Sequence, residues 1–97
     1  MDVRFRNRRL ARCFERESEA VRAFGPTVGR LYRQRVILIR NSRTFESLFT
    51  YRHLRLHPLT GDRRGLYAMN ITGPWRLVLS VDNDTVIFEE VSNHYDD

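Results

Sequence analysis

The last third of the chain constrains the fold most, because strand-like runs follow one another there with only short turns between them. Apolar and polar residues alternate over 75–81, and the runs 66–71 and 85–91 on either side are rich in β-branched and aromatic residues. Glycine, proline, asparagine and aspartate mark turns at 72–74 and 82–84. Connections this short cannot hold a crossover helix, so these strands must pair antiparallel, as a meander.

Helical spacing of apolar residues dominates the part of the chain from residue 7 to residue 40. A first helix is expected to begin at Asn7, a good capping residue, and to end at Gly25. A second helix is expected to start at Pro26, which suits a first helical turn. Periodicity alone would also allow a buried strand at 36–39, but the continuous apolar stripe before this run favours the helix.

The remaining segments complete an α+β prediction. Residues 2–6 alternate as a short N-terminal strand, 41–51 form a connection with one helical turn, and 54–56 alternate as a further strand. The sequence has 97 residues, the size of one domain. We therefore expect a single domain over 1–97, in which a helical hairpin packs on one face of a curved antiparallel meander sheet.

Charge is distributed unevenly along the chain. All 17 basic residues are arginines, and the net charge is +5. Residues 1–64 contain 16 of these arginines and six acids, whereas residues 65–97 contain one arginine and six acids. A planar arginine fork matches phosphate oxygens, so the basic part favours RNA, DNA or an acidic protein as partner. Codon bias in a GC-rich genome would produce the same preference for arginine.

The one arginine of the last third lies inside a predicted strand. If the apolar positions of 75–81 face the helices, the two-residue strand period directs Arg76 and Val78 to the opposite, uncovered face. Arg76 could be paired there with a carboxylate across the sheet, such as Glu89 or Glu90. Alternatively, it could bind an anionic ligand.

Two further groups of polar residues are expected at the rim of this face. One belongs to the segment before the meander and the other to the C-terminal exit of the last strand. They are Arg55, His57, Arg63 and Arg64 in the first group, and Asn93, His94 and Tyr95 in the second. Cleavage of RNA through its own 2′-hydroxyl needs a base, an acid and cations for the phosphate. Histidine and arginine supply these functions near neutral pH.

Other kinds of site have weaker support in the sequence. His53 and His57 have a spacing that would suit a metal on a helix but not on a strand beside proline, so we expect no metal site. No glycine-rich phosphate loop or other cofactor motif is found, and we expect no cofactor. Cys13 is the only cysteine and fits a buried apolar position. Neither a membrane span nor a signal peptide is recognisable, which predicts a cytoplasmic protein.

The second half of the sequence resembles the RelE/ParE superfamily of bacterial toxins, and most closely its HigB-like branch. The pattern is Leu-His-Pro-Leu-x-Gly-Asp at 56–62, an aromatic strand, and Gly-x-Trp-Arg at 73–76. The resemblance implies a type II toxin that cuts mRNA on the ribosome. It also implies an antitoxin partner of the HigA type, a helix-turn-helix protein, in a hetero-oligomeric complex.

Carried over by position, the resemblance implies catalytic roles for His57, Arg76, His94 and Tyr95, and RNA contacts for Arg55, Arg63, Arg64 and Asn93. His57 would be the base, Arg76 would stabilise the phosphate, and His94 would be the acid or a phosphate ligand. Two positions depart from the family pattern. Thr60 replaces a frequent lysine, and residues 92–95 read Ser-Asn-His-Tyr where the family usually ends in Asp-Tyr-His. The alternatives are a ParE-like inhibitor of DNA gyrase and an inactive module that binds an antitoxin or RNA.

Overall fold

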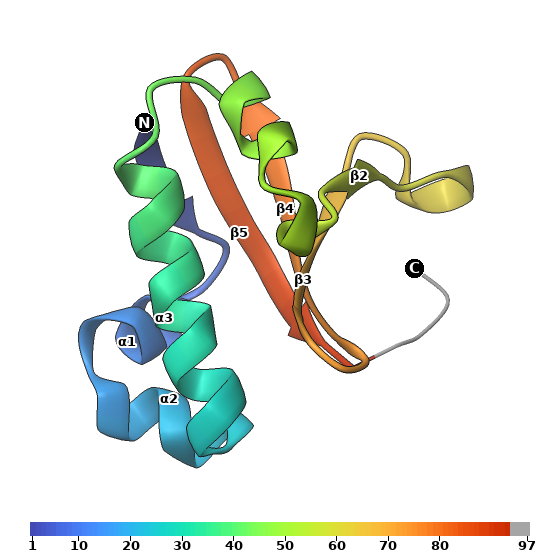
Figure 1. Cartoon of the computed structure of the whole chain (residues 1–97). Coiled ribbons are helices and arrows are strands. Elements are labelled where there is room, and N and C mark those ends of the chain that lie inside the picture. Colours follow the sequence, from blue (N-terminus) through green and yellow to red (C-terminus); the bar gives the residue numbers. More distant parts are fainter. Residues whose placement is uncertain (94–97) are drawn as a thin grey trace.

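Helices cover one face of a five-stranded sheet in the computed structural model, which describes residues 1–93 (Figure 1). This is the predicted α+β class. The elements in chain order are β1 (Asp2–Phe5), α1 (Arg8–Glu15), α2 (Glu17–Phe24), α3 (Pro26–Arg40), the 3₁₀ turns η1 (Glu46–Thr50) and η2 (Arg52–Leu54), β2 (His57–Pro58), the 3₁₀ turn η3 (Gly61–Arg63), β3 (Tyr67–Thr72), β4 (Trp75–Asp82) and β5 (Thr85–Ser92). In the described part of the chain no helix is both long and apolar enough to span a bilayer.

The strand order is β1-β5-β4-β3-β2. Strands β2 to β5 pair antiparallel with their neighbours in the chain, which confirms the predicted meander. The first strand departs from it, because β1 pairs in parallel with β5 through Val3 opposite Val86. A parallel pair needs a long crossover, and the three helices provide part of it. The N-terminal strand therefore closes the sheet at the β5 edge.

The expected first helix is in fact two helices that meet at Arg16. Asn7 caps the start of α1 as predicted, but Arg16 has an extended backbone with φ −129° and ψ 117° and separates α1 from α2. Arg12 lies in the last turn of α1, and Glu17 and Glu19 lie in the first turn of α2. A cation at the C-terminus of a helix and acids at the N-terminus of a helix each interact favourably with the helix dipole. This charge pattern was the available signal for the break.

The second predicted helix is confirmed as α3, including the run 36–39 that could have been a strand. It packs closely on the other two helices. A Cβ atom at Gly29 would lie 2.7 Å from the carbonyl carbon of Ala20, so the backbones of α3 and α2 are in near contact there. The Tyr32 hydroxyl donates a hydrogen bond of 2.7 Å to the Leu10 carbonyl and joins α3 to α1.

Cys13 is buried in the core with 2% exposure, as its position in the apolar pattern predicted. Burial raises the pKa of its thiol, with a smaller contribution from Glu19, although Arg9 and Arg12 oppose the shift. The thiolate is the nucleophilic form of cysteine. Cys13 therefore contributes packing and is poorly suited to nucleophilic chemistry.

Most buried apolar residues form one core between the helices and the sheet. On β4, Leu77 and Leu79 are part of it, and Trp75 and Val81 pack against it, which confirms the predicted facing of this strand. The core residues are Leu10, Cys13, Ala20, Val28, Tyr32, Val36, Ile39, Phe45, Leu48, Leu54, Leu56, Met69, Ile71, Leu77, Leu79, Val86 and Phe88.

The strand predicted at 54–56 is wrong. Leu54 ends η2, and Arg55 adopts the left-handed conformation with φ 49° and ψ 42°. Both Leu54 and Leu56 are buried because the chain turns between them, and this turn imitates the alternation of a strand. Only His57 and Pro58 pair with β3, as the short edge strand β2.

Candidate functional site

The face of the sheet away from the helices carries two of the predicted site residues, His57 and Arg76. Residues directly opposite one another in an antiparallel pair point to the same face. The register therefore defines two neighbouring rows of side chains on this face, which are His57, Ala68, Val78 and Glu90 in one row and Asn70, Arg76 and Ser92 in the other. His57 and Arg76 lie two strands and one row apart, which puts their Cα atoms roughly 12 Å from each other.

This face is less open than the alternation of β4 predicted. Val78 is fully buried, because Leu59 folds back over it and forms a second apolar cluster with Val78 and Ala68. Leu66 packs against the same cluster, and the Leu59 N–H donates to the Leu66 carbonyl at 2.9 Å. The loop between β2 and β3 is thereby anchored on the sheet beside His57. The expectation of an uncovered Val78 is wrong, since sequence alternation does not reveal a loop that returns to the sheet.

Arg76 is half-buried and its side chain is held by hydrogen bonds. Its Nη1 atom donates to Asn70 Oδ1 at 2.8 Å, to the Gly73 carbonyl at 2.6 Å and to the Trp75 carbonyl at 3.0 Å. These three acceptors are neutral, and two of them belong to the backbone near the β3–β4 turn. These three bonds orient the guanidinium at the β3–β4 turn.

The two carboxylates expected near Arg76 have other partners. Glu89 accepts hydrogen bonds from Arg6 at 2.8 Å and from Ser80 at 2.7 Å. Glu90 forms an ion pair with Arg63 at 2.6 Å. Arg63 belongs to η3, so this pair connects the loop after β2 to the strand β5. Arg63, predicted to contact RNA, is thus engaged with a carboxylate of the same chain.

His57 is positioned by the backbone turn before it. Its Nδ1 atom lies 2.7 Å from the Arg55 carbonyl oxygen. A carbonyl can only accept, so Nδ1 carries the proton of this hydrogen bond, and Nε2 of the neutral ring keeps its lone pair. The left-handed backbone of Arg55 sets the direction of that carbonyl. The arrangement is suited to a general base at Nε2.

The other predicted contacts are dispersed. The side chains of Arg55 and Arg64 are exposed, and Asn93 is exposed just beyond β5. His94 and Tyr95 lie outside the described residues. Within residues 1–93, no group of three histidine, cysteine or acidic side chains is close enough to hold a metal ion.

Sequence reasoning missed Asn70 and Arg35, which support Arg76. Arg35 donates to the backbone carbonyls of Asn70 at 3.2 Å and Ile71 at 3.2 Å, and its burial lowers its pKa. These bonds bind α3 to the edge of β3 beyond the short strand β2. One signal was available for Arg35, because it lies four residues from both Leu31 and Ile39 and interrupts an apolar line along α3.

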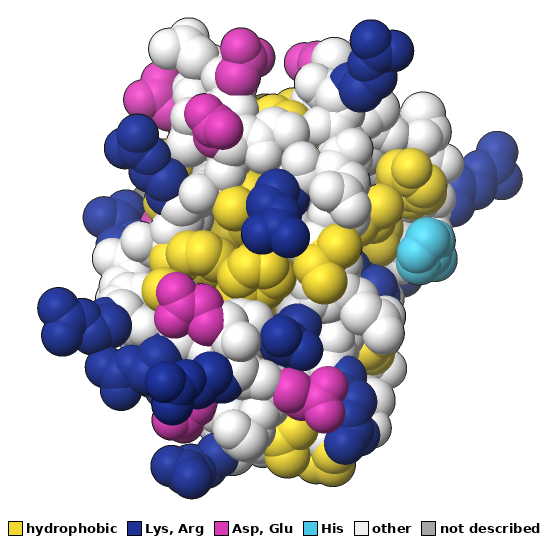
Figure 2. Space-filling view, turned by 90° about the vertical axis from the view of Figure 1, so that its left-hand side faces the viewer, with side chains coloured by type: hydrophobic (Ala, Val, Ile, Leu, Met, Phe, Trp, Pro, Cys, Tyr) yellow, Lys and Arg dark blue, Asp and Glu magenta, His cyan; other side chains and the backbone are white. Residues whose placement is uncertain are grey.

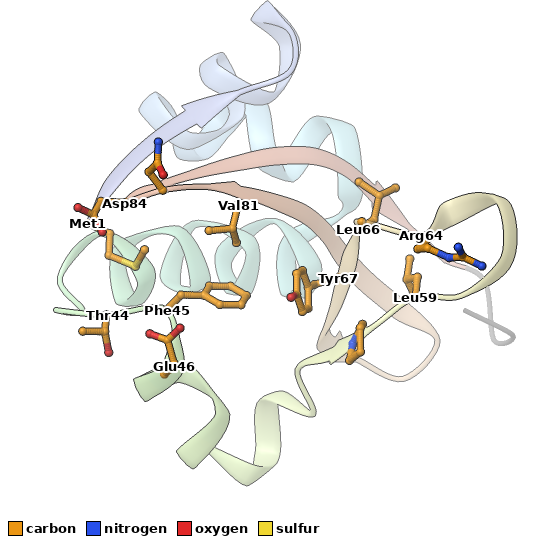
Figure 3. A pocket seen from close by; sticks show the side chains of 13 residues that line it. Met1, Thr44, Phe45, Glu46, Leu59, Arg64, Leu66, Tyr67, Val81 and Asp84 are labelled. Carbon is orange, nitrogen blue, oxygen red and sulfur yellow. The ribbon is translucent and has the colours of Figure 1, made fainter.

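A groove of about 520 Å³ lies elsewhere, between η1 and the loop after β2 (Figure 3). We call it the Tyr67 groove. Phe45, Tyr67 and Val81 give it an apolar lining, Glu46 and Asp84 add carboxylates, and Arg64 lies at its other end. Neither His57 nor Arg76 lines it. Its carboxylates would repel a phosphate chain, so it is not the candidate site for RNA.

Charge is also segregated over the helical side of the molecule (Figure 2). Arginine side chains gather over the lower half of this view, and several acidic side chains gather at its upper end. The strand register also brings two acids close together, because Asp2 and Asp82 both pair with Thr85. The arginine-rich half is at the end of the sheet where α1 and α2 lie (Figure 1).

No protein-family model matches the sequence, and no curated protein matches it. Solved structures do match. YafQ from Escherichia coli has a TM-score of 0.61 and 14% identity, with 94% of this chain and 90% of YafQ covered. In the YoeB–YefM complex from Staphylococcus aureus, the matched chain has a TM-score of 0.63 and 15% identity over 98% of both chains. The YoeB/ParE toxin from Agrobacterium tumefaciens has a TM-score of 0.61 and 18% identity, with 98% of this chain and 100% of the toxin covered.

The fold is that of the RelE-like toxins. The matches extend over nearly the whole of each chain, so they include the helices as well as the meander. The resemblance in sequence was confined to the second half of the chain. At these identities the likeness establishes the architecture, and the chemistry must be argued from the site.

Proposed function

We propose that the chain is the toxin of a type II toxin–antitoxin system and that it cuts mRNA on the ribosome. The observation that carries the proposal is that His57 and Arg76 lie on the same face of a RelE-like sheet. His57 has an Nε2 suited to act as a base, and hydrogen bonds orient Arg76. The HigB-like pattern at 56–62 and 73–76 supports the same assignment. Cleavage would occur in the cytoplasm, where ribosomes and mRNA meet.

The proposed reaction is a transesterification that needs no metal. His57 Nε2 takes the proton of the 2′-hydroxyl, and the 2′-oxygen forms a bond to phosphorus. The bond from phosphorus to the 5′-oxygen breaks, and this oxygen receives a proton from His94. Arg76 stabilises the charge on the phosphate, and Tyr95 and Asn93 contact the nucleotide. The products are a 2′,3′-cyclic phosphate and a 5′-hydroxyl.

The proposed protein partner is an antitoxin encoded beside the toxin, in a hetero-oligomeric complex. The similarity to the YoeB–YefM complex supports a partner of this kind. The HigB-like sequence pattern favours a HigA-like antitoxin with a helix-turn-helix. The arginine-rich surface favours acidic segments in that partner.

Substitution of Arg76 tests the proposal. Arg76→Ala is expected to lower mRNA cleavage on translating ribosomes by about a hundredfold or more, because one lost donor to a developing charge costs this much. Arg43→Ala, which removes one exposed arginine far from the site in sequence, is the matched control and should cleave like the wild type. Equal cleavage by Arg76→Ala and wild type would refute the assignment. Supercoiling defects without cleavage would favour the ParE-like alternative.

A further inference from the structure

We propose that a small pocket beside Arg76 binds one nucleobase of the RNA, an inference that rests on the proposed function. The pocket has a volume of about 260 Å³ and lies between the helices α1 and α2 and the end of β5. We call it the Trp75 pocket. Its lining includes Arg9, Phe24, Trp75, Ser92 and Asn93.

Two aromatic rings give the Trp75 pocket its walls. The ring centroids of Phe24 and Trp75 are 6.4 Å apart with an interplanar angle of 64°. The guanidinium carbon of Arg9 lies 5.3 Å from the Phe24 ring centroid. Both aromatic side chains are half-buried, so part of each ring remains accessible. Single-stranded RNA is recognised chiefly by stacking of its bases on aromatic rings and arginine planes.

Polar groups of the Trp75 pocket can form hydrogen bonds with the edge of a base. Ser92 is 6% exposed, and its Oγ has no hydrogen-bond partner among residues 1–93. A buried polar atom without a partner is costly, and a ligand that supplies the partner recovers this cost. The neighbouring Asn93 is exposed and carries an amide that can both donate and accept.

The Trp75 pocket meets the candidate site through neighbours of Arg76, although Arg76 itself does not line it. Trp75 precedes Arg76 in β4, and Ser92 lies directly opposite Arg76 in the sheet register. Trp75 packs toward the helices and Arg76 faces the other side of the sheet, so an RNA strand would pass the end of β5 to place a base in the pocket and a neighbouring phosphate at Arg76.

The surroundings of the pocket favour an anionic occupant. A second hollow of about 290 Å³ shares Arg9 with the Trp75 pocket and is lined also by Arg12, Arg22 and one acid, Glu19, so that arginines outnumber acids there. These arginines could follow the phosphates of an RNA strand that enters along α1 and α2. The Trp75 pocket includes one carboxylate, Glu90, which is paired with Arg63. The Tyr67 groove has two, Glu46 and Asp84, beside Arg64. The balance of charge therefore favours RNA at the Trp75 pocket.

The only tryptophan of the chain reports directly on this pocket. Short 2′-O-methyl RNA oligonucleotides, which lack the hydroxyl needed for cleavage, should change Trp75 fluorescence in a saturable way. Replacing one nucleotide by an abasic residue keeps the phosphates and is expected to weaken binding at least tenfold at one position, in line with the stacking of a base. Equal affinity at every abasic position, or binding without a change in Trp75 fluorescence, would overturn the inference.

Variants separate this inference from the proposed function. Phe24→Leu and Ser92→Ala are expected to change the distribution of cleaved codons on ribosomes, while Phe49→Leu, at a ring with 46% exposure outside the pocket, is the control. Ser92→Ala removes an unpartnered hydroxyl and should remain folded even if Phe24→Leu does not. If Ser92→Ala cleaved the same codons at the same rate and bound oligonucleotides with the same affinity, the base-binding role of the pocket would be refuted. The proposed nuclease activity would stand. If the wild type bound RNA in a base-dependent way but did not cut it, the base-binding role of the pocket would stand and the proposed nuclease activity would be refuted.

Discussion

The two faces of the sheet differ in what their side chains do. On the helix face, Leu77 and Leu79 belong to a continuous core with all three helices. On the opposite face, the apolar cluster contains only Leu59, Ala68 and Val78 as buried members among the described residues, and polar or charged side chains such as Asn70, Arg76 and Glu90 lie beside it. The comparison indicates that the helix face provides most of the stability. The opposite face instead positions a few polar groups, which the proposed function would use.

Leu77→Ala should have the largest effect on stability. It would leave a cavity in the main core, where Leu77 is fully buried, and a change of this kind costs about 3 to 5 kcal/mol of unfolding free energy. Chemical denaturation of wild type and variant measures the loss. A cost below about 1 kcal/mol would contradict the view that the helix face dominates stability.

Leu59→Ala makes the same chemical change on the opposite face. We expect a smaller loss of stability, of about 2 kcal/mol, because the cluster is small and lies beneath a surface loop that can adjust. The cleavage rate of the folded variant should also fall, because Leu59 anchors the loop next to His57. Rates measured well below the melting temperature separate the two effects. If Leu59→Ala destabilised as much as Leu77→Ala, the two faces would not differ as described.

Glu90→Gln is expected to have the smallest effect. The Arg63–Glu90 pair has side-chain exposures of 33% and 49%, and such surface pairs contribute below about 1 kcal/mol. Loss of the carboxylate releases Arg63 for phosphate, so RNA affinity should rise slightly and become more sensitive to salt. Glu17→Gln, which removes an exposed carboxylate of α2, is the matched control. A fall in RNA affinity for Glu90→Gln alone would indicate that the pair is needed to hold the loop.

Local patterns predicted much of the fold. The alternation over 75–81 correctly identified the residues of β4 that face the helices, and the stripe after Pro26 correctly favoured a helix through 36–39. Features that depend on distant contacts were missed. The parallel pairing of β1 with β5 is one, and the burial of Val78 under a returning loop is another. No local periodicity contains this information.

The candidate site was predicted only in part, because it too depends on contacts between distant parts of the chain. Strand period placed Arg76 on the face away from the helices, and the register now brings His57 to that face. The partners of these residues could not be read from spacing, because Asn70 reaches Arg76 only through the pairing of β3 with β4. The left-handed turn at Arg55, which orients His57, was hidden by an alternation that resembled a strand.

The central claim is that the face bearing Arg76 and His57 cuts RNA through the neighbouring 2′-hydroxyl. The most direct measurement uses ribosomes programmed with an mRNA that contains a single 2′-deoxynucleotide at the mapped cleavage position. The account predicts that this message stays intact, while the unmodified message yields a 2′,3′-cyclic phosphate and a 5′-hydroxyl. Cleavage of the deoxy-substituted message at an undiminished rate, or products with a 5′-phosphate, would contradict it.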